Sequence, residues 1–182
     1  MAKVDMFLKL DGIDGESTDK KHGKEIEPDA IRVGVHNYGK TGSGTGGAGA
    51  GRVRPEDFHF RALPSKASPN LMLYCCSGQT ITNAKLTIRV AGKDQQERIV
   101  YTMTNVLISS YRSGLGFDVS ETPEGFDWSI EGGQTATDDW VQYDYFSLNY
   151  ATLQMAYSAQ KPDGTVEGAL TKGWNFTTNV SI

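Results

Sequence analysis

Hydrophobic and polar residues alternate along most of this chain, with the period of two that is typical of β-strands. Both Val4–Leu10 and Ala84–Val90 place an apolar residue at every second position. The pattern predicts strands over Val4–Leu10, Ile31–Val35, Ala84–Val90, Ile99–Tyr111 and Trp140–Ala159, and aromatic pairs mark two more at Phe58 and Phe60 and at Trp174 and Phe176. In the longest stretch the inward-facing set changes phase after Tyr150, which predicts a bulge or bend near Ala151 and Thr152.

One segment has the signals of a helix instead. Ser68 is a good N-cap, Pro69 suits the first helical position, and Gly78 lies where a helix commonly ends. The stretch between them, Leu71–Cys76, is apolar on all sides, so we expect its neighbours to bury the helix and its two thiols. One helix among about seven strands predicts a mainly β fold, either a sandwich or a barrel.

Length and charge narrow the class of protein. The 182 residues suit a single domain, residues 1–182, and the net charge of −4 argues against nucleic acid or an anionic membrane as the main partner. The longest apolar run, Leu71–Cys76, is too short to cross a bilayer. Asp5 and Lys9 interrupt the N-terminal stretch, so we expect no secretory signal peptide and a cytoplasmic location.

Two segments depart from the strand pattern. Gly39–Gly51 holds seven glycines and predicts a flexible loop within the domain. Asp118–Asp144 holds eight carboxylates and no lysine or arginine. Residues 1–91 carry 13 basic and 10 acidic groups, whereas residues 92–182 carry 5 and 12. The acidic stretch is either a solvated loop or part of a surface through which copies of the chain associate.

The sequence offers little that would support catalysis. Gly34–Thr41 matches the P-loop pattern, but a glycine-rich run follows it where a phosphate-binding loop needs a helix. The histidines, His22, His36 and His59, have no spacing that would form a zinc site with the adjacent Cys75 and Cys76. We therefore expect no catalytic residue, no metal and no cofactor.

Several blocks of the sequence together resemble one protein family, the haemolysin-coregulated protein (Hcp) family. No single block is diagnostic, but they keep their order and cover nearly the whole chain. The blocks are Val4–Ser17, Ser68–Gly92, Asn105–Tyr111, Leu148–Tyr157 and Gly173–Asn175.

This resemblance implies a fold and a function. The fold would be a barrel of two antiparallel β-sheets with one helix packed alongside. The protein would be a non-enzymatic subunit of the type VI secretion tube, in which six copies form a ring and rings stack. Its partners would be other copies, the contractile sheath, spike proteins and effectors carried in the lumen. It would leave the cell through the type VI system without a signal peptide.

One segment departs from the family pattern. About 25 residues, Gly116–Asp139, lie between two strands that follow each other closely in the family. We expect the glycine loop at 39–51 and this acidic insertion at 116–139 to supply contacts between subunits or between rings. The candidate residues are Gly42, Gly44, Gly46, Gly47, Gly49, Asp138 and Asp139. Two rival functions remain open: a monomeric β-barrel that binds a small apolar ligand, and an enzyme with a site built from loops.

Overall fold

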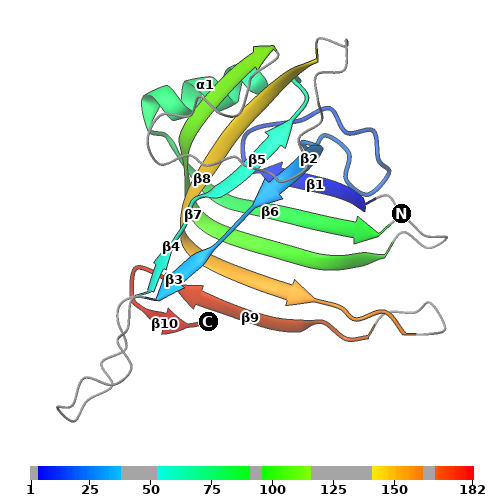
Figure 1. Cartoon of the computed structure of the whole chain (residues 1–182), viewed down its shortest axis with the longest axis vertical. Coiled ribbons are helices and arrows are strands. Elements are labelled where there is room, and N and C mark those ends of the chain that lie inside the picture. The colour runs from blue at the N-terminus through cyan, green and yellow to red at the C-terminus, as the bar shows by residue number, and fades with distance from the viewer. Residues whose placement is uncertain (1–3, 38–52, 91–95, 116–140, 162–166) are drawn as a thin grey trace.

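The computed structural model describes residues 4–37, 53–90, 96–115, 141–161 and 167–182 (Figure 1). This part of the chain is mainly β with one helix, as the sequence predicts, and it has ten strands where the sequence predicts about seven. The elements are β1 (Val4–Leu10), β2 (Pro28–Arg32), β3 (Val35–Asn37), β4 (Val53–Pro55), β5 (Phe58–Ala62), α1 (Ser68–Ser77), β6 (Thr80–Val90), β7 (Glu97–Leu115), β8 (Gln142–Tyr157), β9 (Leu170–Asn175) and β10 (Val180–Ser181).

The strands form two antiparallel sheets. Eight strands belong to the larger sheet, with six in the order β1-β6-β7-β8-β5-β2, while β9 pairs with β8 and β10 pairs with β9. The smaller sheet contains β3 and β4. The first half of β8 pairs with β5 and its second half pairs with β9, so this long strand has a different neighbour along each half of the side that faces away from β7.

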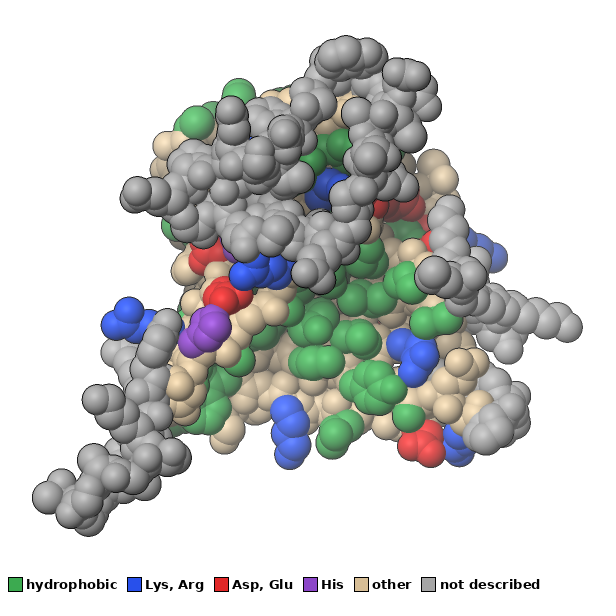
Figure 2. All heavy atoms as spheres, in the orientation of Figure 1, with side chains coloured by type: hydrophobic (Ala, Val, Ile, Leu, Met, Phe, Trp, Pro, Cys, Tyr) green, Lys and Arg blue, Asp and Glu red, His purple; other side chains and the backbone are tan. Residues whose placement is uncertain are grey.

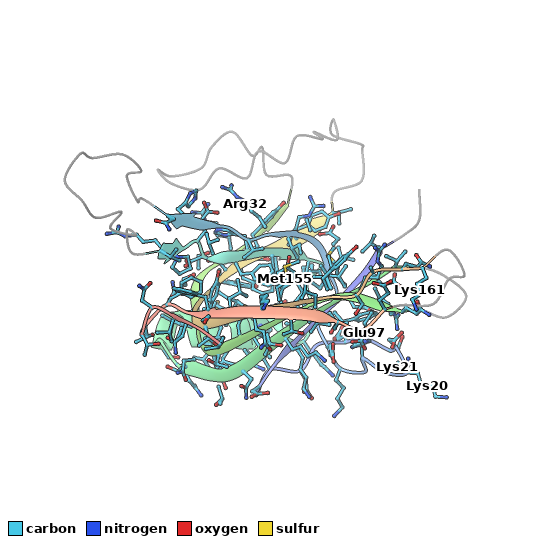
Figure 3. The ribbon with its side chains drawn as sticks, turned by 90° about the horizontal axis from the view of Figure 1, so that it is seen from below. Lys20, Lys21, Arg32, Glu97, Met155 and Lys161 are labelled. Atoms are coloured by element: carbon cyan, nitrogen blue, oxygen red, sulfur yellow. The ribbon has the colours of Figure 1, made fainter. Side chains whose placement is uncertain are left out.

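The larger sheet curls until its two ends meet. Leu8 of β1 donates its N–H to Ile26 at 2.8 Å and accepts from the N–H of Ile26 at 2.9 Å, two residues before β2 begins. The curled sheet encloses the core, and Figure 3 shows side chains filling the space between its two layers. Three phenylalanines from β5 and β8, Phe58, Phe60 and Phe146, lie at the centre with no exposed surface.

The strand expected over Ile31–Val35 is in fact divided into two. β2 ends at Arg32, and β3 begins at Val35 in the other sheet. Gly34 lies against Glu56, where a β-carbon would be 2.5 Å from Oε2, and the Glu56 N–H donates to the Gly34 carbonyl at 2.9 Å. A phosphate-binding loop needs N–H groups that converge on the phosphate. Here β3 and the carboxylate of Glu56 occupy that position instead. The rest of that motif, residues 38–41, lies outside the described residues.

The bend expected near Ala151 and Thr152 is present: Figure 1 shows β8 changing direction between its two halves, and Asn105, which faces this point from β7, has a φ of +50°. A separate bulge lies in β7, where the register against β8 shifts between Ile108 and Ser110. Close to Ala151, β8 changes its partner from β5 to β9, and the Ala151 carbonyl accepts the N–H of Phe176 at 2.9 Å. The change of phase in the sequence marks this bend, because the strand turns there and the opposite set of side chains comes to face inward.

The prediction that α1 is buried is wrong. The helix begins at Ser68 with Ala67 in the N-cap position, and it ends at Gly78, whose φ of +65° is the left-handed conformation that glycine favours. Only Leu71 is buried, whereas Met72 and Leu73 are 51% and 56% exposed. The helix packs one side against the sheet at β7, so most of its apolar surface faces outward.

The exposure of α1 changes what we expect of the thiols. Cys76 is exposed and Cys75 is half-buried, with burial, followed by the neighbouring Cys76, raising the pKa of the Cys75 thiol. We expect an alkylating reagent to label Cys76 in the native protein and to label Cys75 more slowly, because less of Cys75 is accessible and less of it is thiolate. Mass spectrometry of peptides after timed labelling measures both rates. Equal rates would contradict this assignment.

The start of α1 is fixed by a buried carboxylate. The Ser68 hydroxyl donates to Asp144 of β8, and Asp144 is only 2% exposed. This residue belongs to the acidic stretch that the sequence suggests is solvated, so at this position that interpretation is wrong. A strand residue can be buried here because the helix N-terminus supplies a donor to its carboxylate.

We expect Asp144→Ala to lower the free energy of unfolding by about 1–3 kcal/mol, because the hydroxyl of Ser68 loses its acceptor in a buried place. Asp144→Asn, which keeps a side-chain acceptor, is expected to cost less. Urea denaturation followed by circular dichroism measures the difference. Wild-type stability in Asp144→Ala would show that the contact contributes nothing.

Candidate assembly surface

One face of the larger sheet is apolar along four adjacent strands, β1, β6, β7 and β8, and it extends to Leu170 of β9, beside which Lys172 pairs with Met155. Across these strands, Ile88 of β6 stands opposite Ile99 of β7, which stands opposite Tyr157 of β8. The next row has Leu86, Tyr101 and Met155 in the same relation. We use the name apolar face for the part of this side of the sheet that lies farthest from the core. It comprises Val4, Met6, Ile88, Ile99, Tyr101, Met155, Tyr157 and Leu170.

The apolar face continues from the core into solvent. Leu86 and Met103 are fully buried, but Met155 and Tyr157 are each 39% exposed and Leu170 is 66% exposed. Figure 2 shows hydrophobic side chains gathered over the strands that lie lowest in Figure 1. In Figure 3, Met155 lies on the side of the sheet that faces Arg32 and β2. Continuous apolar surface of this kind commonly marks a contact with another molecule.

Strand length explains why this surface stays uncovered. β6, β7 and β8 contain 11, 19 and 16 residues, whereas β2 and β5 in the opposite layer contain five each. In β6, β7 and β8, apolar and polar side chains continue to alternate beyond the part of the sheet that β2 and β5 cover. Their inward positions therefore remain apolar where no described part of the subunit packs on them.

The opposite face of the same strands is polar outside the row of Phe7, Thr87, Val100 and Ala156, in which Phe7 and Thr87 are buried. One row contains Lys9 of β1, Lys85 of β6, Thr102 of β7 and Gln154 of β8. A second row contains Thr104 and Thr152, whose hydroxyls are 2.6 Å apart. The two lysines are directly paired and both exposed, which is unfavourable unless solvent surrounds them. This face suits contact with water.

The edges of the sheet have unused pairing capacity. β10 pairs with β9 only at Trp174 and Asn175, so in the described part of the chain Leu170–Lys172 has no strand on its outer side. β1 likewise pairs beyond β6 only through Leu8 and Leu10. Proteins usually cover or charge such edges, because exposed edges pair with other chains.

The residues that the sequence proposed for assembly lie outside this surface. Gly42, Gly44, Gly46, Gly47, Gly49, Asp138 and Asp139 all fall in ranges that lie outside the described residues, as do the loops at 39–51 and 116–139. The alternation in β6, β7 and β8 did contain a signal for the apolar face. By itself the alternation indicates only an inward-facing set, because the sequence does not show where the covering layer ends.

Two of the histidines, His22 and His36, contact the carboxylates of Glu25 and Glu56. His36 bonds to Glu56, and Arg32 Nη2 lies 3.9 Å from the same carboxylate. The hydrogen bond from His36 lowers the pKa of Glu56, and burial lowers the pKa of His59. His22 is buried and stacked on Phe7 with ring centroids 4.4 Å apart. In the described part of the chain, no group of three or more histidine, cysteine or acidic residues is placed to hold a metal ion.

Comparison with known proteins agrees with the resemblance in the sequence. Residues 7–157 match the family described as type VI secretion system effector, Hcp. The chain is 38% identical over 179 residues to protein hcp1 of Pseudomonas aeruginosa, covering 97% of this chain and 98% of that protein. The chain belongs to the Hcp family of type VI secretion proteins.

Solved structures have the same fold. The crystal structure of Hcp1 from Salmonella typhimurium superposes with a TM-score of 0.72 at 30% identity, covering all of both chains. A structure described as a type six secretion system protein gives a TM-score of 0.80 at 27% identity, covering 99% of this chain and all of the other. Hcp is a family of secreted tube proteins of type VI secretion and not a family of enzymes.

The helix of the described chain is not long and apolar enough to cross a membrane.

Proposed function

We propose that this chain is a structural subunit whose copies associate through the apolar face into hexameric rings, which stack to form the inner tube of a type VI secretion system. The observation that carries the proposal is the apolar face, a surface continuous with the core that no described part of the subunit covers. Burying exposed apolar side chains is the main driving force of association. Family membership supports the tube as the product of that association.

The two faces of the sheet suggest how the subunit is oriented. A ring with cyclic symmetry brings two different surfaces of neighbouring subunits together. The apolar face and the free edges of β1 and β9 suit these contacts. The polar face with Lys9 and Lys85 suits a water-filled lumen that holds effectors. The sheath and the spike would contact the assembled tube, and the protein would move from the cytoplasm through the system without a signal peptide.

The two loops retain a role in this proposal. A glycine-rich segment costs much entropy to order, about 1–2 kcal/mol per residue, so it becomes ordered only where neighbours supply contacts. We propose the loop at 39–51 and the residues Asp138 and Asp139 as contacts between subunits or between stacked rings. The charge difference between the two halves of the chain would speed association at low salt.

Mass measurement tests the assembly. Light scattering after gel filtration should give six times 19.9 kDa for the wild type, and electron microscopy should show rings. Met155→Glu places a charge on the apolar face and should shift the protein to a folded species of 19.9 kDa. Gln154→Glu adds the same charge to the adjacent residue on the polar face, so it should leave the ring intact.

Two results would contradict the proposal. Full-size rings of Met155→Glu would show that the apolar face is not the contact. A wild-type protein that stays monomeric at high concentration would exclude the ring itself. It would favour the rival function, a single barrel that binds a small apolar ligand.

A further inference from the structure

A second surface lies on the outer side of the layer that β2 and β5 form, away from the apolar face. In this layer β2, β5, the first half of β8 and the end of β7 lie side by side, and Phe58, Phe60 and Phe146 point inward. The residues that alternate with them point outward. Figure 3 shows Arg32 above this layer, on the side away from Met155. We call the outward side the arginine–tyrosine face, and it comprises Arg32, His59, Arg61, Arg112, Tyr143 and Tyr145.

The arginines of this face lie beside tyrosine rings. The strand register places Arg61, Tyr145 and Arg112 in one row across β5, β8 and β7. The guanidinium carbon of Arg61 lies 4.8 Å from the centre of the Tyr143 ring, and the centroids of the Tyr143 and Tyr145 rings are 6.4 Å apart. Arg61 donates hydrogen bonds of 2.8 and 3.0 Å to Asp29. The face therefore offers both positive charge and aromatic surface to a segment that packs on it.

Parts of the arginine–tyrosine face are buried although no described element covers it. Ser147 lies beside His59 in the central row and has no exposed surface. His59 and Tyr145 are half-buried, and burial lowers the pKa of His59. The helix α1 packs on β7 beside the inward-facing Asp144, and no other described element packs closely on the outward side. The burial therefore indicates a cover that the described strands do not supply.

The chain contains a segment whose composition matches this face. Residues 116–140, which lie outside the described residues, connect Leu115 of β7 to Val141, the residue before β8. Leu115 pairs with Gln142, so the segment leaves and rejoins the sheet at the edge of the arginine–tyrosine face. It contains seven carboxylates and no lysine or arginine, and its aromatic residues are Phe117, Phe126, Trp128 and Trp140. Carboxylates suit the arginines, and aromatic rings suit the tyrosines.

The two attachment points favour this segment over a separate molecule. An extended chain advances about 3.3 Å per residue, so 25 residues that return to their starting edge reach out roughly 40 Å. The five residues of β5 span only about 17 Å. Because the segment is attached at both ends, its effective concentration at the face is on the order of millimolar, which a separate peptide rarely reaches.

We propose that residues 117–131 dock on the arginine–tyrosine face of their own subunit. Carboxylates of the segment pair with Arg112 and Arg32, and its aromatic side chains pack on Tyr143 and Tyr145. A purely acidic segment would leave the tyrosine rings uncovered, and a purely apolar one would bury the arginines without acceptors. This segment supplies both kinds of group. Asp138 and Asp139 lie outside the docked range and keep the role proposed above, so the inference goes beyond the proposed function and does not depend on the ring.

Hydrogen exchange of the full chain, followed by mass spectrometry, measures the docking. Arg112→Gln removes one positive charge from the arginine–tyrosine face. Lys85→Gln, the control, removes the same charge from an exposed residue on the polar face of β6. We expect amides from 117 to 131 to exchange at least fivefold faster in Arg112→Gln than in the wild type, because a charge-assisted contact is lost, and to be unchanged in Lys85→Gln. Circular dichroism confirms that both variants are folded.

Cross-linking then shows which copy of the segment lies on the face. Arg61→Lys places an amine there, and a carbodiimide joins that amine to a carboxylate in contact with it, forming an amide with loss of water. A link to Asp29 is the positive control, and we expect further links to carboxylates between residues 118 and 131. When light and ¹⁵N-labelled copies are unfolded together and refolded, both linked peptides should carry the same isotope. Lys85 should form no link to this range.

Three outcomes would overturn the proposal. The first is equal exchange at 117–131 in the wild type, Arg112→Gln and Lys85→Gln. The second is a link to Asp29 with none to the segment, which would show that the segment lies elsewhere. The third is a set of links between peptides of different isotope, which would assign the face to a second copy of the chain. A protein that stays monomeric would still pass all of these tests, so failure of the ring and failure of the docking are distinguishable.

Discussion

Phe60→Ala is expected to lower the free energy of unfolding by about 3–5 kcal/mol, because it removes a large ring from the centre of the core. Phe60 has no exposed surface. It stacks on Phe58 with centroids 4.6 Å apart and on Phe146 with centroids 5.2 Å apart. These three rings connect β5 to β8, so the substitution leaves a cavity between the strands that join the two layers of the barrel.

Chemical denaturation at a fixed protein concentration measures this effect, since association also contributes to apparent stability. Leu63→Ala is the control, because Leu63 lies just after β5 and is 59% exposed. It should change stability by less than about 0.5 kcal/mol. A loss below about 1.5 kcal/mol for Phe60→Ala would mean that the surrounding side chains collapse into the space, and that the three-ring stack is not the centre of the core.

Leu71→Ala is expected to cost about 2–5 kcal/mol, whereas Leu73→Ala should cost less than about 0.5 kcal/mol. Both leucines lie in α1 and have the same helix propensity, so the difference isolates burial. Leu71 is 2% exposed and belongs to the core, and Leu73 is 56% exposed. The side chain of Leu71 is what attaches α1 to the barrel.

The same denaturation measurement, carried out on both variants, decides between two arrangements of the helix. The observed arrangement gives a large cost at Leu71 alone. The arrangement expected from the sequence, with the helix surrounded on all sides, gives similar costs at both leucines. Equal losses in subunits that stay monomeric would therefore place α1 inside the barrel and contradict the structure.

Most of the strands could be predicted from the alternation of side chains alone. Val4–Leu10 is β1 with the same bounds, and Ala84–Val90 lies within β6. This works because successive side chains of a strand point to opposite sides, so burial on one side leaves a period of two in the sequence. The division at Val33 and Gly34 could not be predicted in this way. It depends on Glu56, which lies more than twenty residues away in the chain.

The candidate assembly surface shows a different limit. The sequence indicates that Ile99, Tyr101 and Met155 point inward, and the register confirms that they share one face with the core. Whether an inward position is buried depends on the covering layer, which β2 and β5 provide over only part of the sheet. The lengths of distant strands decide exposure, and no local pattern contains that information.

The mainly β class, the helix with its C-terminal glycine and, through blocks spread over the chain, the family all follow from the order of the amino acids. These properties depend on interactions between neighbouring residues or on residue identities at fixed spacings. The packing of distant segments is what places α1 outside the barrel, buries Asp144 against Ser68 and buries Arg89 beside Asp19. Each of these depends on segments far apart in the chain, because burial is a property of the packed whole.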